Sequence, residues 1–321
     1  MRKLIFIFLA VSCLLFSCRP APEYVTISGY AQGGTYAVKF NISGATATRE
    51  QIQAAVDSIL LEVDNTLSGY NRSSMLSRYN KGQEIEENEM WREMMDRAKA
   101  YREETGGALD CFSAPIFDVW GFGFTGNGAP DPEIVKAAVE STKNSRKVNF
   151  NAIAQGYSCD LVAEYLHSVG VTDMLVDIGE IYCEGQNPIR QNWSIGVDNP
   201  KDGNNVPGAD IKAILVTDGK PQGIVTSGNY RKFYLKDGKK YAHTLDPRTG
   251  YPVEHNLLSA TIIAPKAIDA DAYATYCMVI GLEDSKSFIL GREDVEGYLI
   301  YSENGVTRTW HSPGFNLVTE N

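Results

Sequence analysis

The chain has 321 residues, a net charge of −10 and a hydrophobic content of 43%, which suits one large globular domain or two smaller ones. The excess of Asp and Glu argues against a nucleic-acid-binding protein, because phosphate backbones call for a basic surface. The cysteines show no C-x-x-C spacing, so no zinc site is predicted. We expect mostly free, buried thiols at the four cysteines in the body of the chain, which are Cys111, Cys159, Cys183 and Cys277.

The first residues predict an export signal. Arg2 and Lys3 precede an apolar stretch from Leu4 to Phe16, which is shorter than the roughly 20 residues that a spanning helix needs. The stretch ends at Leu-Phe-Ser-Cys18, which resembles a bacterial lipoprotein signal, and an ordinary signal peptide cut nearby is the alternative. We therefore expect residues 1–17 to be removed, Cys18 to be lipidated and residues 18–23 to form a tether. Loss of Arg2 and Lys3 would bring the net charge to −12, so the membrane would hold the protein by its lipid alone.

The N-terminal half of the remaining chain, residues 24–321, begins with two alternating segments and continues with helices. Residues 24–30 and 35–42 alternate as strands, with a hairpin-like turn at Gln32-Gly33-Gly34. Thr48-Arg-Glu-Gln51 predicts a capping box, and apolar residues at helical spacing follow it. Two more helices are expected, one over residues 87–105 and one that follows Gln155-Gly156 and ends at Gly170.

The C-terminal half is predicted to be mainly strands. We expect a helix over residues 269–280, a polar loop over residues 200–208 and a turn at Thr226-Ser-Gly-Asn-Tyr230. The expected strands cover residues 174–178, 193–197, 211–216, 223–226, 232–235, 258–264 and 297–301. Strands grouped with interspersed helices predict an α+β fold in one compact unit.

Asp271 and Thr275 form the first candidate functional pair. They are four residues apart on a predicted helix, so a carboxylate and a hydroxyl share one face. Ligation by oxygen alone favours Mg²⁺, or Ca²⁺ or Mn²⁺, over Zn²⁺, and a backbone carbonyl or a substrate phosphate could complete the shell. The structural alternative is a carboxylate near a helix N-terminus that interacts with the macrodipole.

His243 is the second candidate, in the segment His243-Thr-Leu-Asp-Pro-Arg-Thr-Gly250. It lies where a strand meets an Asp-Pro turn, and an imidazole that titrates near neutrality can accept a proton from an attacking hydroxyl. The alternative is a histidine that satisfies local backbone groups. A general base beside hard oxygen ligands predicts metal-assisted attack on a phosphate.

Other segments are less specific. The run from Asn149 to Asp160 joins a strand to a helix through small residues, and a helix N-terminus favours anions, but it contains neither a P-loop nor a G-x-G-x-x-G pattern. Tyr70 could stack on a flat ring, and Trp120-Gly-Phe-Gly-Phe124 offers further aromatics. Core or turn packing is the more common explanation for both.

Taken in order, nine segments resemble the ApbE family, the FAD:protein FMN transferases, over about residues 24–300. They are Gly34-Thr-Tyr36, Leu67-Ser-Gly-Tyr70, Thr105-Gly-Gly-Ala-Leu-Asp110, Trp120-Gly-Phe-Gly123, Ala152-Ile-Ala-Gln-Gly-Tyr-Ser-Cys-Asp160, Leu175-Val-Asp-Ile-Gly179, Thr226-Ser-Gly228, the His243–Gly250 segment and Asp271-Ala-Tyr-Ala-Thr275. The chain departs from the family's usual residues at Gly33, Asn149 and Gln155, and has one glycine, Gly179, where members generally have two.

The resemblance implies a compact α+β fold related to the T-fold, with mixed, largely antiparallel sheets and packed helices. It implies an enzyme that uses FAD as substrate with Mg²⁺ and attaches FMN to a threonine or serine of an exported protein, releasing AMP. Asp271, Thr275 and the main-chain carbonyl of Ala152 would hold the metal, and His243 would be the base. Tyr70 would stack on the flavin, and the rest of the FAD site would be Gly33, Ala108, Leu109, Asp110, Asn149, Gln155 and Leu245.

Family analogy implies acceptors such as exported subunits of sodium-pumping NADH:quinone oxidoreductase (Nqr) or of Rnf-type complexes. The protein would face the periplasm in a bacterial cell envelope, anchored to the inner membrane rather than the outer. Two alternatives use the same residues. One is a Mg²⁺-dependent FAD pyrophosphatase that gives FMN and AMP, and the other is a non-catalytic periplasmic flavin-binding lipoprotein.

Overall fold

The computed structural model describes residues 21–123, 130–201, 204, 206, 208–230, 233–236 and 239–320. The predicted signal, the lipidation site Cys18 and the start of the predicted tether lie outside the described residues, as do Phe124, Lys232 and part of the predicted loop over 200–208. Within the described ranges, no helix combines the length and the apolarity that crossing a bilayer requires. The predictions for the N-terminal segment therefore stay predictions.

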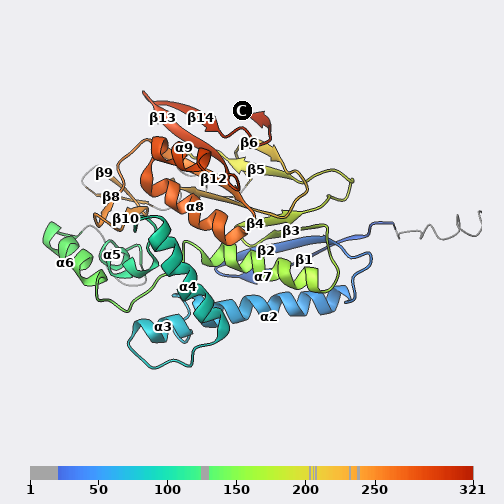
Figure 1. The fold of residues 1–321 in the computed structure, drawn as a ribbon, viewed down its shortest axis with the longest axis horizontal. Helices are drawn as coiled ribbons and strands as arrows, with labels where there is room; N and C mark the ends of the chain where they lie inside the picture. The colour runs from blue at the N-terminus through green and yellow to red at the C-terminus, as the bar shows by residue number, and fades with distance from the viewer. Residues whose placement is uncertain are drawn as a thin grey trace, which may run out of the picture.

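Helices and strands alternate in blocks along the chain (Figure 1). The helices are α2 (Arg49–Leu67), α3 (Met75–Asn80), α4 (Glu89–Glu104), the 3₁₀ turn η1 (Cys111–Ser113), α5 (Ala114–Val119), α6 (Pro132–Thr142), α7 (Ala154–Ser168), α8 (Ala267–Ile280) and α9 (Leu282–Leu290). The strands are β1 (Tyr24–Ala31), β2 (Gly34–Asn41), β3 (Met174–Asp177), β4 (Ile181–Glu184), β5 (Ser194–Asp198), β6 (Ile211–Val216), β7 (Gln222–Gly228), β8 (Phe233–Lys236), β9 (Lys239–Ala242), β10 (Leu245–Asp246), β11 (Tyr251–Pro252), β12 (Leu257–Ala264), β13 (Glu296–Glu303), β14 (Val306–His311) and β15 (Leu317–Glu320).

One eight-stranded sheet forms the centre, in the order β1-β2-β3-β4-β7-β12-β13-β14. Every neighbouring pair in it is antiparallel. Because side chains alternate along a strand, adjacent residues of β7 point to opposite faces. Val225 belongs to the core beneath the helices, whereas Ile224 packs in the core shared with the three-stranded sheet β15-β6-β5. The sheet therefore lies between a helical layer and a second, smaller sheet.

Helices α7 and α8 lie next to each other against the central sheet (Figure 1). Helix α2 packs beside α7 and against β1, and α4 contacts α2. Two glycines allow this close packing. A Cβ on Gly156 of α7 would lie 2.3 Å from the carbonyl oxygen of Ala267 in α8. A Cβ on Gly223 of β7 would lie 2.2 Å from the Cα of the same alanine. The N-terminal end of α8 is thus held between α7 and the sheet, with no room for a larger residue at either glycine.

The α+β prediction is confirmed, and most predicted elements match within a few residues. The capping box is present, since Thr48 accepts the Gln51 N–H and the Gln51 side chain accepts the Thr48 N–H. The turn predicted at Thr226–Tyr230 is wrong at its start, because residues up to Gly228 pair with β12 inside β7. Helices α3, α5, α6 and α9 were not predicted. The four cysteines named above are free and buried, as expected.

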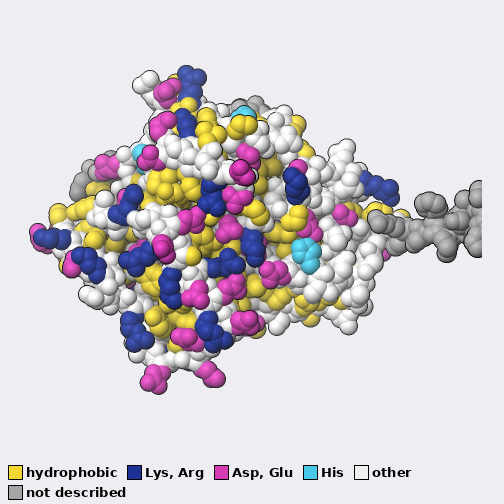
Figure 2. All heavy atoms as spheres, in the orientation of Figure 1, with side chains coloured by type: hydrophobic (Ala, Val, Ile, Leu, Met, Phe, Trp, Pro, Cys, Tyr) yellow, Lys and Arg dark blue, Asp and Glu magenta, His cyan; other side chains and the backbone are white. Residues whose placement is uncertain are grey.

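Basic and acidic side chains are interspersed over the face that carries α2, α4 and α8 (Figure 2). Within α4, charges pair at helical spacing, for example Arg97 with Glu93 at 3.0 Å and Lys99 with Asp96 at 2.9 Å. Exposed pairs of this kind contribute at most about 1 kcal/mol each. This face therefore carries charges of both signs rather than a continuous basic or acidic patch.

Candidate functional site

A cavity of about 300 Å³ opens where α8, the start of α7, the end of β7 and the segment after β9 meet. It contains every predicted metal and catalytic residue and every predicted flavin-site residue except Gly33. Further lining residues are Cys111, Phe117, Phe122, Asn151, Glu180, Thr226, Ser227, Gly228, Thr244, Pro247, Met278 and Val279. Segments from seven parts of the sequence thus meet in one cavity of the size that small-molecule sites have.

Asp271 lies inside the α7–α8 contact. Its side chain is 5% exposed, and Oδ2 accepts the N–H of Gly156 at 3.0 Å. Burial raises the pKa of Asp271 well above its usual range, and the nearby Asp160 carboxylate adds to the rise. In the part of the chain that the structure describes, no hydrogen bond to Oδ1 forms. A buried carboxylate with one oxygen left over calls for a proton or a cation.

The alternative given for Asp271, a carboxylate near its own helix terminus, does not describe its contacts. Asp269 occupies the first turn of α8 and accepts the Tyr101 hydroxyl at 2.5 Å. Asp271 instead satisfies the N–H of Gly156 in the first turn of α7, a helix whose N-cap residue Ile153 makes no side-chain cap. Capping and metal binding are compatible here, because the cap uses a single oxygen.

Thr275 lies one turn after Asp271 and also faces the cavity. Its hydroxyl is 3.4 Å from the Ser227 hydroxyl of β7, so a second chain segment orients it. Among the described residues, no three His, Cys, Asp or Glu side chains cluster as a metal site. A cation here would therefore need one carboxylate, hydroxyl oxygens and main-chain or substrate oxygens. That donor set fits Mg²⁺, which is commonly held by one or two carboxylates together with substrate phosphates.

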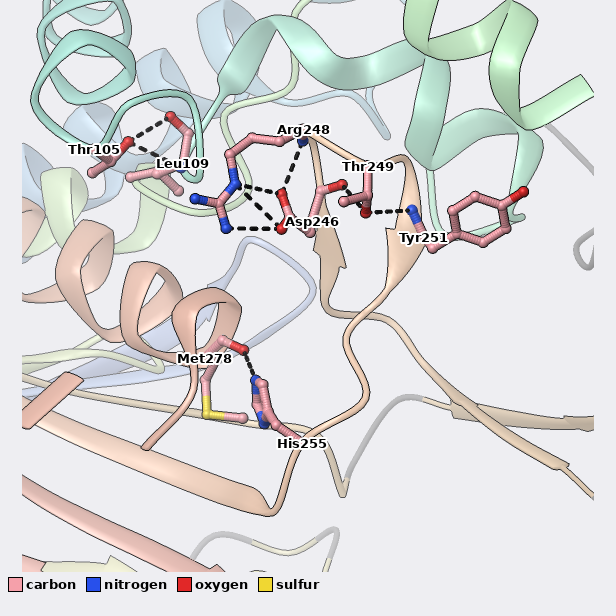
Figure 3. A network of polar contacts seen from close by, with 8 residues as sticks. All are labelled: Thr105, Leu109, Asp246, Arg248, Thr249, Tyr251, His255 and Met278. Carbon is pink, nitrogen blue, oxygen red and sulfur yellow. Dashed lines mark hydrogen bonds and ion pairs between the residues drawn. The ribbon is translucent and has the colours of Figure 1, made fainter. Parts of the chain in front are cut away.

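His243 lies between β9 and β10, and its half-buried ring lies 6.4 Å from the Phe122 ring at 69°. The turn that follows is fixed by Asp246 (Figure 3). Its carboxylate accepts the Arg248 main-chain N–H at 2.9 Å. The Arg248 guanidinium also donates to it, from Nε at 2.9 and 3.2 Å and from Nη2 at 2.8 Å. Trp120 then donates its indole N–H to the Gly250 carbonyl at 2.7 Å. A rigid turn therefore carries His243 and Leu245 to the cavity.

A second turn presents Ala108, Leu109 and Asp110. The Thr105 hydroxyl accepts the Leu109 N–H at 3.0 Å and donates to the Tyr101 carbonyl at 2.7 Å, as Figure 3 shows in part. Gly106 and Gly107, with φ of 57° and 80°, make the reversal possible. Burial raises the pKa of Asp110, although the Phe112 N–H and the Arg102 guanidinium oppose the rise.

The remaining predicted residues come from three segments. The Asn149 side chain accepts the Asn151 N–H at 2.9 Å and so closes a tight turn before α7. Gln155 donates to the Ile178 carbonyl at 3.2 Å, which links α7 to the β3–β4 hairpin. Tyr70 is 69% exposed and lies at the cavity rim. Gly33 lies in the β1–β2 turn with φ of 82° and is not among the residues that line the cavity, so its flavin-binding role stays a prediction.

Residues 32–299 match the profile of the ApbE family, and the chain belongs to that family. The FAD:protein FMN transferase of Haemophilus influenzae is 30% identical over 349 aligned positions, covering 100% of this chain and 99% of that protein. The FAD:protein FMN transferase of Salmonella typhimurium is 31% identical, covering 96% of this chain and 95% of that protein.

Solved structures agree with the sequence comparison. The flavin transferase ApbE from Vibrio cholerae superimposes with a TM-score of 0.80 at 28% identity, covering 92% of this chain and 98% of that one. The apo form of the Pseudomonas stutzeri flavinyl transferase ApbE gives a TM-score of 0.78 at 30% identity, with 91% and 95% coverage. The predicted family and the predicted fold are therefore both confirmed.

Proposed function

We propose that this protein transfers the FMN moiety of FAD to a threonine or serine hydroxyl of a partner protein and releases AMP, with Mg²⁺ as cofactor. The observation that carries the proposal is the convergence of Tyr70, His243, Asp271 and Thr275 on one cavity. The names of the relatives, which are FAD:protein FMN transferases, support the same reaction.

In the proposed step, the acceptor hydroxyl oxygen attacks the phosphorus on the FMN side of the FAD diphosphate. The new O–P bond forms as the bond from this phosphorus to the bridging oxygen breaks, and AMP leaves with that oxygen. A ring nitrogen of His243 accepts the hydroxyl proton, a contribution typically on the order of 10²–10⁴ in rate. Such transfers depend on positioning and charge stabilisation more than on covalent help from the protein.

Asp271, Thr275 and the main-chain carbonyl of Ala152 would hold the metal. When bound, Mg²⁺ would neutralise diphosphate charge and polarise the phosphoryl oxygens. Tyr70 would stack on the isoalloxazine ring at the rim. The turn over residues 108–110, with Asn149, Gln155 and Leu245, would line the rest of the FAD site, since these residues lie along the same cavity.

The test replaces His243 by alanine. We expect bound FAD to remain and covalent flavin on the acceptor to fall by about 10²-fold or more. His311→Ala is the matched control, because this histidine lies on β14 and is exposed, outside the cavity lining. Attachment is read by in-gel flavin fluorescence and by the acceptor mass. Transfer at the wild-type rate in the His243 variant would remove the base from the proposal, and AMP with only free FMN would favour the pyrophosphatase.

We also propose that Cys18 carries a lipid and holds the enzyme on the periplasmic side of the inner membrane. Its acceptors there would be exported redox subunits, such as those of Nqr- or Rnf-type complexes. Cys18→Ala should move the protein from the membrane to the soluble fraction of a cell lysate. Retention of the variant in the membrane fraction would contradict the lipid anchor.

A further inference from the structure

A second cavity, of about 620 Å³, adjoins the first and shares Tyr70 with it. The loop after α2, helix α3, helix α5 and the segment before α7 form its walls. Its charged lining residues are Arg72, Lys81, Lys147 and Asp118. Tyr70 therefore separates two hollows, of which the first contains the predicted reaction residues.

The second cavity is basic in a chain whose net charge is −10. Lys147 pairs with Asp118 at 3.2 Å, and the Lys81 ammonium donates to the main-chain carbonyl of Arg72 at 3.3 Å. Neither contact neutralises Arg72, which is exposed and whose guanidinium has no partner among the residues that the structure describes. Two of the three cations are thus available to an incoming anion.

FAD does not supply that anion if the proposed function holds, and the inference rests on that function. The anionic groups of FAD are its two phosphates, and the reaction requires them beside Asp271, Thr275 and His243 in the first cavity. The isoalloxazine ring against Tyr70 is uncharged near neutral pH. The cations beyond Tyr70 are therefore left for the second substrate of the proposed reaction, a protein chain.

We propose that the second cavity binds an acidic segment of the acceptor protein, next to the hydroxyl that receives FMN. Carboxylates of this segment would pair with Arg72 and Lys81, and Tyr70 would separate the segment from the flavin. Charge complementarity of this kind directs encounter and fixes register. The basic cavity would thus allow this protein, whose net charge is negative, to bind acidic acceptors at one place on its surface.

The test measures binding of two labelled peptides to the FAD-loaded enzyme by fluorescence anisotropy in 50 mM salt. The peptides share a central threonine and differ only in flanking Glu and Asp against Gln and Asn. We expect the acidic peptide to bind about tenfold more tightly, and the double variant Arg72→Gln/Lys81→Gln to lose that preference. FAD affinity should stay unchanged. Arg78→Gln is the matched control, an exposed arginine of α3 outside the cavity lining, and should keep the preference.

Equal binding of the two peptides overturns the inference. An equal loss of the preference in Arg78→Gln overturns it as well, because the preference would then come from the overall charge of this surface and not from the cavity. A loss of FAD affinity in the double variant overturns it too, because the cavity would then bind part of FAD. The measurement needs no turnover, so it is separate from the proposed function. If the preference depends on Arg72 and Lys81 but no acceptor becomes flavinylated, the transferase proposal alone fails.

Discussion

Replacing Gly156 by alanine would place a methyl group where α7 meets α8. The new Cβ would lie 2.3 Å from the Ala267 carbonyl oxygen and 2.8 Å from the Asp271 Cβ, both far inside van der Waals contact. Alanine is the better helix former by about 1 kcal/mol. Overpacking of a fixed backbone costs about 3 kcal/mol, at the upper end of its usual range. We therefore expect a net destabilisation of about 2 kcal/mol.

The same change should reduce activity more than stability. Relief of the overlap moves α7 and α8 apart, which stretches the 3.0 Å bond from the Gly156 N–H to Asp271 and displaces this carboxylate. A shift of about 1 Å in a positioning group can lower the rate on the order of 10²-fold. Urea unfolding gives the stability change, and flavin attachment at saturating Mg²⁺ gives the rate.

Gly223→Ala is the control for this experiment. Its Cβ would lie 2.2 Å from the Ala267 Cα, so it disturbs the same helix from the sheet side, one turn before Asp271. We expect a similar loss of stability and a smaller loss of activity. Wild-type stability and activity in Gly156→Ala would refute the reasoning, because α7 and α8 would then separate without consequence for Asp271.

Three further predictions concern residues around this helix pair. Asp160→Ala should lower the unfolding free energy by about 3 kcal/mol in a urea titration, because it leaves the N–H groups of residues 267 and 268 buried without an acceptor, whereas Asp160→Asn should lose less. Thr275→Val keeps the side-chain shape but removes the oxygen proposed to bind Mg²⁺, so the Mg²⁺ concentration for half-maximal attachment should rise by about tenfold or more. An unchanged Mg²⁺ titration would argue against the ligand role. His255 is neutral in the fold because burial lowers its pKa, while its ring bonds the Met278 carbonyl at 2.9 Å and accepts the Leu257 N–H at 3.3 Å. Its stabilising contribution is therefore present above pH 6.5, the ordinary pKa of histidine, and is lost as the pH falls through the lowered pKa. The melting temperatures at pH 7.5 and pH 5 should therefore differ less in His255→Gln than in the wild type.

Local signals were sufficient for the elements that sequence predicted correctly. The capping box at Thr48 specified the start of α2, and strict alternation specified β1 and β2. Helices α3 and α5 have only six residues each, too few to show a helical period. Helix α6 does have a proline start at Pro132, a signal that could have found it. The segment that contains Ser227 was predicted as a turn, because glycine and asparagine follow this serine.

The pair Asp271 and Thr275 could be found from spacing along one helix, whereas the meeting of His243 with that pair could not. The turn at Asp246 brings His243 to the cavity. Their chemistry and the family resemblance had paired the two segments, but neither gives a distance between them. The resemblance also named Gly33, which lies in the β1–β2 turn and is not among the lining residues, so its role stays a prediction. Sequence motifs thus identify the segments that form a site, but the distances between these segments are known only from the fold.

The contacts between α7 and α8 explain why a carboxylate can be kept buried at this site. Asp160 of α7 accepts the N–H groups of Ala267 and Ile268, at 2.8 and 2.9 Å, at the start of α8. Asp271 of α8 in turn accepts the N–H of Gly156 at the start of α7. Each helix therefore supplies the cap that the other lacks, since neither has a side-chain cap at its own N-cap residue. Asp160 uses both oxygens for this purpose, and burial raises its pKa to about 6. Asp271 uses one, so the same pairing that fixes the two helices leaves Oδ1 of this cavity-lining residue without a hydrogen bond from the described residues.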